Sequence, residues 1–437
     1  MPPSDAQPGA GMTRAPAALA RILAADPAQA AELEAGVERA ALACGLDAPA
    51  AARLAQAVEE VFVFVATRAP GTSFGVELRD RRHRIDARLR CRLPTEALHW
   101  FNITQAIDVS DPDALDALGL LLASRLVDRL SVSLDPDGGI LLTLEQARQY
   151  PIPAEGDGPS PAPAALVDAP AAAVGASVPG LARLFRQRMG ISVPRQFQAD
   201  GLVRDLVEAG DLSALVVHDA AGHVQGGVAW TQRQPKLVEM LGPVTAGDDP
   251  AVAAVLVEAA ILALAGSGVA MIYAEERGPG FPEAEFDCLG QLGSRPLHFR
   301  VIAEDVGAVT WADSVTRPFL AVFYEALGLA RGVSDAPAAA VDRPERALLA
   351  AEIDRVASRV TLRPLLDGTD LPTLIAEHVD RFAGEGLDDF RFETDHGVPW
   401  QGGIGRDLMQ AGFFPRVVLP HGGLGDVIVW ERDWMPM

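Results

Sequence analysis

Lysine is almost absent from this chain of 437 residues: it occurs once, at Lys236, and arginine carries the remaining positive charge. A P-loop needs a lysine directly after its glycines, and Lys236 has no such loop before it. A Schiff base with pyridoxal phosphate would also have to use this one residue. The scarcity of lysine therefore excludes a P-loop nucleotide site.

Cysteine is scarce too, and its three occurrences, Cys44, Cys91 and Cys288, are isolated and lack CxxC spacing. This argues against a disulfide framework or a structural zinc site and favours a reducing compartment. The first residues, 1–11, lack the charged-then-apolar pattern of a signal peptide and are expected to form a disordered tail. The longest apolar run, 252–264, is too short to span a bilayer. We expect a cytoplasmic protein.

Motifs of several enzyme classes are missing as well. No Gly-x-Ser-x-Gly elbow is present, and no HxH or HExxH spacing supports a metal site, so we predict no metal ligands. Asp395 with His396, and His421 with Asp426, are the combinations that suggest a His/carboxylate site.

The chain is strongly acidic, with a formal net charge of -22. Such a charge repels phosphates, so we expect neither nucleic acid nor an anionic membrane as a partner. Hydrophobic residues make up 49% of the chain and charged residues 22%, which is typical of a soluble globular protein. Its length predicts two or three domains.

Proline and alanine mark the domain boundaries. The range 151–175 is rich in both and is expected to be an extended linker, and 331–343 is a second, weaker break. The predicted domains are 12–150, 176–330 and 344–437. Each mixes helices with strands, so the predicted fold class is α/β (α+β).

The most informative segment of the first domain is 116–132, DALGLLLASRLVDRLSV, where leucines spaced three and four apart predict an amphipathic helix. The turn signal DPDGG and the apolar run ILLTL follow it, and they predict a strand pair. A second helix is expected over 47–68, with Asp47 as its cap. Two strands are expected between these helices, at 73–78 and 84–93.

This order of elements resembles the ATP-binding domain of bacterial anti-sigma-factor kinases, within the histidine-kinase-type ATPases, and implies a two-layer sandwich. In that family a helix carries a Glu and, four residues later, an Asn that holds magnesium; here these positions are Glu60 and Phe64. The adenine-binding Asp falls near Leu93-Pro94, and of the Gly-x-Gly that receives phosphate only Gly119 remains, after Ala117-Leu118. The order of elements therefore resembles that family, whereas the side chains that bind ATP and magnesium in it are missing here.

The middle domain resembles the GNAT N-acetyltransferases. The stretch 201–228 predicts a helix, a strand, a polar turn and a strand with paired glycines, and 241–244 then matches the splayed strand of that family. The resemblance implies acyl-CoA held by the backbone at Leu241, Val244 and Gly247, before a helix over 250–265. The family's basic residue and second glycine are missing from the loop 245–250, where two aspartates stand instead.

Two tyrosines, Tyr273 and Tyr324, are candidates for the general acid of such a site, although no local motif marks either. Leu292-Gly293 retains part of the Leu-Gly-Phe that the family carries before its last strands. In the C-terminal domain we expect a helix over 344–359, and Gly412–Trp430 reads as strand, turn and strand. That ending resembles a second, truncated acetyltransferase-like unit.

The whole chain thus resembles a bacterial fusion of an anti-sigma-kinase-like domain with a GNAT-like region. We expect a signalling or regulatory protein that acts by binding a protein partner, of the sigma-pathway or anti-anti-sigma type, with a homodimer left open. Protein-kinase activity is not expected. The alternative is an active N-acyltransferase that its N-terminal domain regulates. Acyl-CoA is the first candidate cofactor and ATP with magnesium the second.

Overall fold

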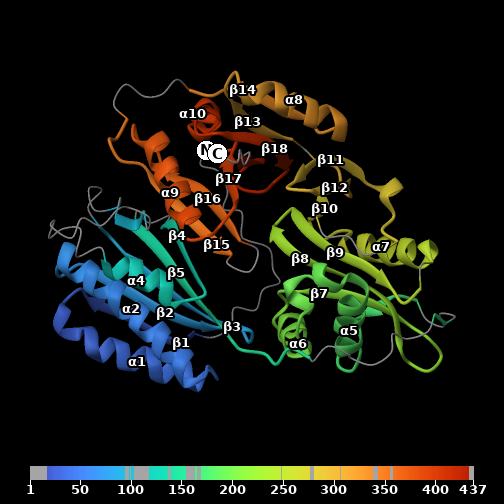
Figure 1. The fold of residues 1–437 in the computed structure, drawn as a ribbon, viewed down its shortest axis with the longest axis horizontal. Helices are drawn as coiled ribbons and strands as arrows, with labels where there is room; N and C mark the ends of the chain where they lie inside the picture. Colours follow the sequence, from blue (N-terminus) through green and yellow to red (C-terminus); the bar gives the residue numbers. More distant parts are fainter. Residues whose placement is uncertain are drawn as a thin grey trace, which may run out of the picture.

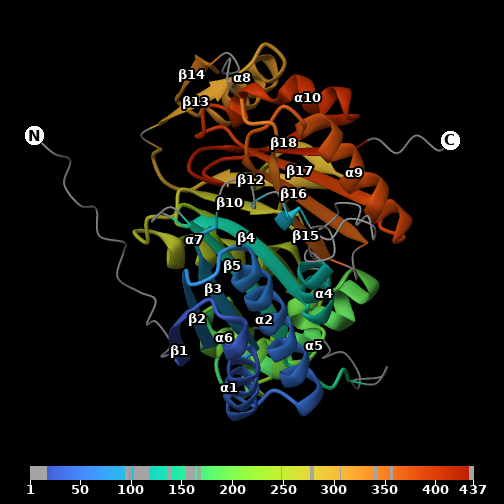
Figure 2. The same ribbon diagram turned by 90° about the vertical axis from the view of Figure 1, so that its left-hand side faces the viewer.

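The computed structural model describes residues 17–93, 98, 100–102, 118–135, 139–153, 163–164, 169–247, 249–275, 280–305, 307–337, 343–354 and 358–432. In these ranges helices and strands are mixed throughout, as expected (Figure 1). Figure 2 shows the C-terminal elements stacked above the other two parts of the chain. Within these ranges, no helix combines the length and apolarity that a membrane crossing needs.

The N-terminal unit is one antiparallel sheet with helices on one face (Figure 2). Its strands, in spatial order, are β1 (Ala17–Ala24), β2 (Ser73–Asp80), β3 (Arg84–Cys91), β5 (Gly139–Ala147) and β4 (Arg129–Asp135). The helices are α1 (Ala30–Ala43), α2 (Ala48–Arg68) and α4 (Leu118–Leu126). The two strands expected after the 47–68 helix and the strand pair expected after α4 are confirmed, and so is the cap, because the Asp47 side chain accepts from Ala50 N at 2.7 Å. The edge strand β1 was not expected.

The helix expected over 116–132 is wrong in length, because the chain turns into β4 soon after α4 ends. Leu118 and Leu122, expected on the buried stripe, are each 41% exposed. Further on, Leu130 and Val132 are buried and alternate with serines. That period of two fits a strand, and pairing with β5 over the length of β4 decides the outcome against the helix.

The middle unit is a seven-stranded sheet that is antiparallel except where β9 and β10 run parallel. Its strands are β11 (Asp287–Leu292), β12 (Arg295–Val301), β10 (Met271–Ala274), β9 (Leu237–Thr245), β8 (Val224–Gln234), β7 (Ser213–His218) and β6 (Ala171–Ala172). Helices α5 (Ser177–Met189) and α6 (Asp200–Ala209) share one hydrophobic core with it, and α7 (Pro250–Leu264) shares another.

The C-terminal unit has a five-stranded sheet and a separate parallel pair, β13 (Ala308–Ala312) and β14 (Arg331–Asp335), joined by α8 (Thr316–Leu327). The sheet contains β15 (Leu348–Asp354), β16 (Arg359–Leu366), β17 (Asp389–Asp395), β19 (Val427–Arg432) and β18 (Phe413–Leu419). Its helices are α9 (Leu371–Gly384) and the short α10 (Gly405–Gln410).

Two expectations for this region are wrong. The helix expected over 344–359 is not formed, because its middle is the strand β15, which pairs along its whole length with β16. The break expected over 331–343 begins with β14, and its first residue, Arg331, has a completely buried side chain. One hydrophobic core runs from Leu237 of β9 to Trp430 of β19, so no gap in the packing separates the middle and C-terminal units.

The middle and C-terminal sheets repeat one order of connection. In each, an antiparallel hairpin (β8–β9 or β15–β16) leads through a helix (α7 or α9) to a strand parallel to the one before it (β10 or β17). A final hairpin follows (β11–β12 or β18–β19), and its second strand pairs with β10 or β17.

A buried histidine on α9 gives the fold a predictable response to acid. His378 is 0% exposed, and Nδ1–H donates to Leu374 O at 2.8 Å. Burial lowers the pKa of His378 from 6.5 to about 4. The imidazole therefore stays neutral in the folded chain over a range where the unfolded chain takes up a proton. Its contribution to stability is complete above pH ~6.5 and is lost as the pH falls toward ~4.

We expect the wild type to lose roughly 2–3 kcal/mol of unfolding free energy between pH ~7 and pH ~4.5 relative to His378→Leu, which has no group to titrate. Urea denaturation of both proteins at the two pH values measures this. Parallel pH profiles of the two proteins would contradict it.

Candidate functional site

The edge of β9 is the feature on which a ligand site in the middle unit depends. β9 and β10 pair only from Leu237↔Met271 to Tyr273↔Glu239. β9 then continues to Thr245, paired with β8 on its other side. Among the described residues, no strand pairs with β9 on the β10 side beyond Glu239. Backbone groups on that side of β9 therefore take no part in strand pairing within the described ranges, although all residues of β9 are buried.

The side chains on this stretch of β9 serve the core. Leu241 is 2% exposed and Val244 is 0% exposed, and both pack in the core that contains α5. Gly242 has a positive φ of 85° and lies against Phe185. The two residues predicted from the sequence to bind acyl-CoA can therefore contribute only their backbone groups.

The loop between β9 and α7 combines a helix N-terminus with acidic capping. Asp249 caps α7, because its side chain accepts from Ala251 N at 2.9 Å. A Cβ on Gly247, the third predicted contact, would lie 3.1 Å from Pro163, so the linker passes close to this loop. Ala164 N donates to the Gln225 amide oxygen at 3.2 Å. An anion at this loop would lie near backbone N–H donors, but also near the Asp249 carboxylate and Pro163.

The equivalent place in the C-terminal sheet is closed by the chain itself. Where β16 and β17 part, Gln401 donates to Pro364 O at 3.0 Å and accepts from Asp395 N at 2.7 Å, so its amide bridges the two strands. At the start of α9, Gly368 is too close to the Ala347 backbone for a Cβ to fit. These contacts join β16 to β17 and bring the Ala347 backbone against Gly368.

The two candidate tyrosines lie in separate places, and both are buried. Tyr273 of β10 is 7% exposed, and its hydroxyl hydrogen-bonds with the Arg233 guanidinium. Burial, and then the charge of Glu239, raise the pKa of Tyr273 well above its usual value. Tyr324 lies on α8, where its hydroxyl is 3.3 Å from Thr310 Oγ1. Burial, and then Asp426, raise the pKa of Tyr324 as well. Both hydroxyls therefore keep their protons at neutral pH.

Tyr324 borders a buried charge network that no sequence motif marks. The Arg331 and Asp426 side chains are 0% exposed, and Asp305 is 5% exposed. Arg331 reaches Asp305 at 2.6 Å and Asp426 at 2.7 Å. The His421 ring lies 2.8 Å from Asp305, while Asp426 accepts from the backbone N–H of His421. His421 and Asp426, suggested together from the sequence, do meet, but the carboxylate at the His421 ring is that of Asp305.

The second suggested combination, Asp395 with His396, has a structural role. His396 Nδ1 lies 2.6 Å from Trp311 O, and its Nε2 lies 3.0 Å from Thr394 Oγ1. Asp395 accepts backbone N–H groups of the β18–β19 turn. Within the described part of the chain, no group of three or more His, Cys, Asp and Glu is arranged to hold a metal ion.

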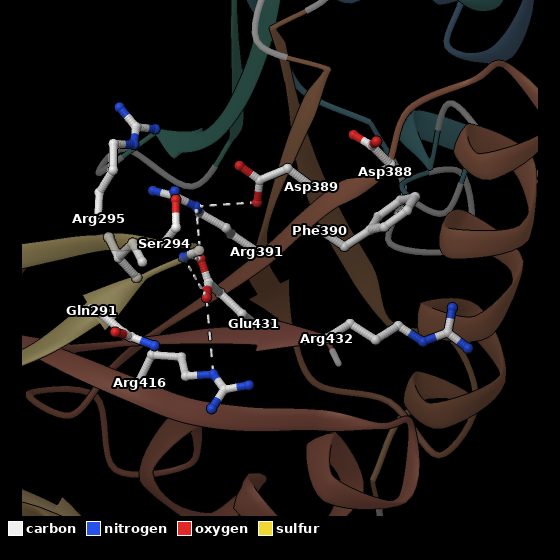
Figure 3. A pocket seen from close by; sticks show the side chains of 12 residues that line it. Gln291, Ser294, Arg295, Asp388, Asp389, Phe390, Arg391, Arg416, Glu431 and Arg432 are labelled. Carbon is white, nitrogen blue, oxygen red and sulfur yellow. Dashed lines mark hydrogen bonds and ion pairs between the residues drawn. The ribbon is translucent and has the colours of Figure 1, made fainter. Parts of the chain in front are cut away.

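A second charged cluster lies where the β11–β12 hairpin meets the C-terminal sheet (Figure 3). Arg391 is the centre of this cluster: it lies 3.3 Å from Asp389, 3.5 Å from Glu431 and 3.6 Å from Glu275. Glu431 also accepts from Gly293 N at 2.9 Å. Burial raises the pKa of Glu431, against the lowering effects of that N–H and of Arg391. The cluster ties the end of the hairpin to β17 and β19.

Sequence reasoning named His421 and Asp426 of the first cluster but not Arg331 or Asp305, and it missed the Arg391 cluster altogether. One signal was present for Arg391, which stands between two phenylalanines: β17 buries all three residues, and a buried arginine needs a charged partner. The partners lie on other strands, so the sequence cannot identify them.

The N-terminal candidates are brought together, but without space between them. A Cβ on Gly119 of α4 would lie 2.7 Å from Glu60 Oε2 of α2. Burial, and then Glu59, raise the pKa of Glu60. Phe64, at the position of the magnesium ligand, is 2% exposed and packs edge-on against Phe101, with ring centroids 5.7 Å apart. Leu93 is described; Pro94 and Ala117 lie outside the described residues.

No protein-family model matches the chain, and no curated protein matches it. Two solved structures that resemble part of it are N-acetyltransferases. The aminoglycoside 6′-acetyltransferase type Ii is 12% identical, covers 29% of this chain and 90% of its own, and has a TM-score of 0.24. The GNAT family N-acetyltransferase YhbS from Escherichia coli, in complex with CoA, is 18% identical, covers 39% of this chain and 90% of its own, and has a TM-score of 0.26.

Proposed function

We propose that the chain is an acyl-CoA-binding regulatory protein of the GNAT type, with one ligand site, at β9. The observation that carries this proposal is the backbone edge of β9 beyond Glu239, which no described strand takes up. An amide-bearing ligand pairs with such an edge as a further strand would. Leu241 and Val244 would hold it through their backbone groups, and the Gly247 loop would lie at its phosphates.

In the other two units, side chains of the chain itself occupy the places where a ligand would lie, and this supports the assignment. Glu60 and Gly119 are in contact where a nucleotide would have to lie between α2 and α4. Gln401 bridges the parting strands of the C-terminal sheet. We therefore assign the N-terminal unit to binding a protein partner or a second copy, and the C-terminal unit to support of the fold.

The surroundings of the two tyrosine hydroxyls support a regulatory role for the chain over catalytic turnover. Neither hydroxyl is free, since Tyr273 is bonded to Arg233 and Tyr324 lies among Thr310 and Asp426. A general acid must reach the leaving thiolate, and a proton held by burial is hard to donate. We expect CoA binding without measurable acyl transfer.

Titration calorimetry of the full chain with CoA, acetyl-CoA and Mg-ATP tests the proposal. CoA and acetyl-CoA are expected to bind and Mg-ATP is not. At 100 times its Kd the bound ligand should add about 2.7 kcal/mol of stability, or roughly 2–4 °C in Tm. Absence of CoA binding would refute the proposal.

Gly247→Glu is the diagnostic variant, because it adds a carboxylate at the loop and should weaken CoA binding at least tenfold. Gly384→Glu is its matched control, since Gly384 has open space at its Cβ position and lies at the end of α9. Release of thiol from acetyl-CoA in the presence of an amine panel separates binding from transfer. Steady release of thiol would contradict the regulatory role and would support an active acyltransferase instead.

A further inference from the structure

Cationic side chains are missing from the three segments that meet at the loop between β9 and α7. These segments are the linker at Pro163–Ala164, the start of β8, and the loop itself. They belong to the stretches 149–182, 205–232 and 237–276, and none of these stretches contains a lysine or an arginine. A phosphate placed at this loop therefore meets no cationic side chain from any of the three segments.

Backbone donors at the loop are partly used within the protein. Ala246 N donates to Gln225 O at 2.8 Å, and Ala251 N donates to the Asp249 carboxylate at 2.9 Å. Pro250, the first residue of α7, has no N–H. A helix N-terminus binds phosphate through free N–H groups, and α7 has lost two of those that its first turn could offer.

The acidic side chains at the loop give it a negative charge. Asp249 caps α7 through its carboxylate, and Asp248 stands before it in the sequence. Asp219 is linked to the loop through Gln225, whose side-chain amide donates to Asp219 at 3.0 Å and whose backbone O accepts from Ala246 N. These carboxylates repel a pyrophosphate, most strongly at low ionic strength. The loop is therefore unsuited to hold the nucleotide part of CoA.

Strand β9, in contrast, offers only neutral groups beyond Glu239. Residues 240–245, MLGPVT, include no charged side chain, and the edge that β10 leaves unpaired consists of backbone groups. The acyl-pantetheine arm of CoA is an uncharged chain with amides, and such a chain pairs with a strand edge as a further strand does. Because β9 is buried along its whole length, the site suits a narrow neutral chain better than a broad charged nucleotide.

We infer that the β9 site recognises the acyl-pantetheine arm alone, and that the nucleotide of CoA adds nothing to the affinity. This specificity rests on the proposed function, because it concerns the same site. Asp249 then has a second role besides capping α7, since its charge disfavours the pyrophosphate. The same arm is present in CoA and in simple pantetheine thioesters, and their relative affinities distinguish the two sources.

Calorimetric titration of the full chain with pantetheine, CoA and adenosine 3′,5′-bisphosphate tests the inference. We expect pantetheine to bind at least as tightly as CoA, and the bisphosphate, which is the nucleotide part alone, not to bind. Raising the salt from about 0.1 M to about 1 M shortens the reach of the repulsion from about 10 Å to about 3 Å. CoA binding should therefore tighten relative to that of pantetheine, whereas a phosphate held by arginine would be released by salt.

Asp249→Asn is the diagnostic variant. Asparagine caps a helix about as well as aspartate does, so the fold should be kept while the charge is removed. We expect CoA to bind about three- to fivefold more tightly and pantetheine to bind as in the wild type. Asp26→Asn is the matched control, because Asp26 also caps a turn before a proline and accepts from Ala28 N at 3.0 Å in the N-terminal unit. It should change neither affinity.

The outcomes separate this inference from the proposed function. Tighter binding of CoA than of pantetheine, weaker CoA binding at high salt, binding of the bisphosphate alone, or an unchanged CoA affinity in Asp249→Asn would overturn the inference and leave CoA binding at β9 intact. Failure of both pantetheine and CoA to bind would refute the proposed function, and the inference with it. Circular dichroism of each variant shows whether the fold is kept.

Discussion

Replacement of Arg331 by methionine is expected to lower the free energy of unfolding by about 3–5 kcal/mol. The side chain is 0% exposed and neutralises two acids, Asp305 at 2.6 Å and Asp426 at 2.7 Å. Methionine keeps much of the volume and removes the charge, so two buried carboxylates lose their shared partner. Urea denaturation followed by circular dichroism measures the loss.

The effect should depend on pH in a known direction. Arg331, with His421, holds the pKa of Asp305 below its usual value despite burial. In the variant that pKa rises, so acid restores part of the lost stability by neutralising the carboxylate. Arg21→Ala removes an exposed pair with Glu32 and should cost roughly 1 kcal/mol or less. Equal losses in the two variants would contradict the buried network.

Replacement of Trp430 by alanine is expected to cost about 3–5 kcal/mol, as large-to-small changes at fully buried aromatics do. Trp430 is 0% exposed in the shared core, and its indole N–H donates to Thr394 Oγ1 at 2.9 Å. The substitution leaves a cavity beside β17 and also removes one of the two partners of the buried Thr394 hydroxyl, which keeps His396. Denaturation midpoints and m-values together measure the change.

Two further variants make the result specific. Trp430→Phe keeps most of the ring volume and should cost less than the alanine variant. Leu424→Ala, at a side chain 87% exposed in the β18–β19 turn, should change stability by roughly 0.5 kcal/mol or less. A loss at Trp430 no larger than at Leu424 would mean that the core around β19 is not tightly packed.

Much of the middle unit was predictable, because its signals are local. The proline at position 250 after the capping Asp249 predicts the start of α7, and the polar turn after His218 separates β7 from β8. The expected helix over 344–359 failed because alanines and leucines suit a helix when the segment is considered alone. Pairing of β15 with β16 overrides that preference.

The ligand sites were predictable only in part. Glu60 and Gly119, which the first resemblance named separately, lie close together in the structure, and Gly247, which the second named, lies in the loop before α7. Neither resemblance anticipated that Gln401 bridges β16 and β17, or that Pro163 lies against Gly247. Those contacts join residues that nothing in the local sequence relates.

The sequence by itself determined the mixed α/β class, the acidic character of the chain, and the residue types at position 64 and in the loop after β9, where a phenylalanine and two aspartates stand. These follow from side-chain identity and local periodicity. Only the tertiary structure decided which strand edges stay unpaired and which candidate ligand sites are occupied by side chains. It also decided which charges meet: Arg331 and Asp426, for example, are 95 positions apart in the chain. Such contacts depend on how sheets pack, and packing is a property of the whole chain rather than of any segment.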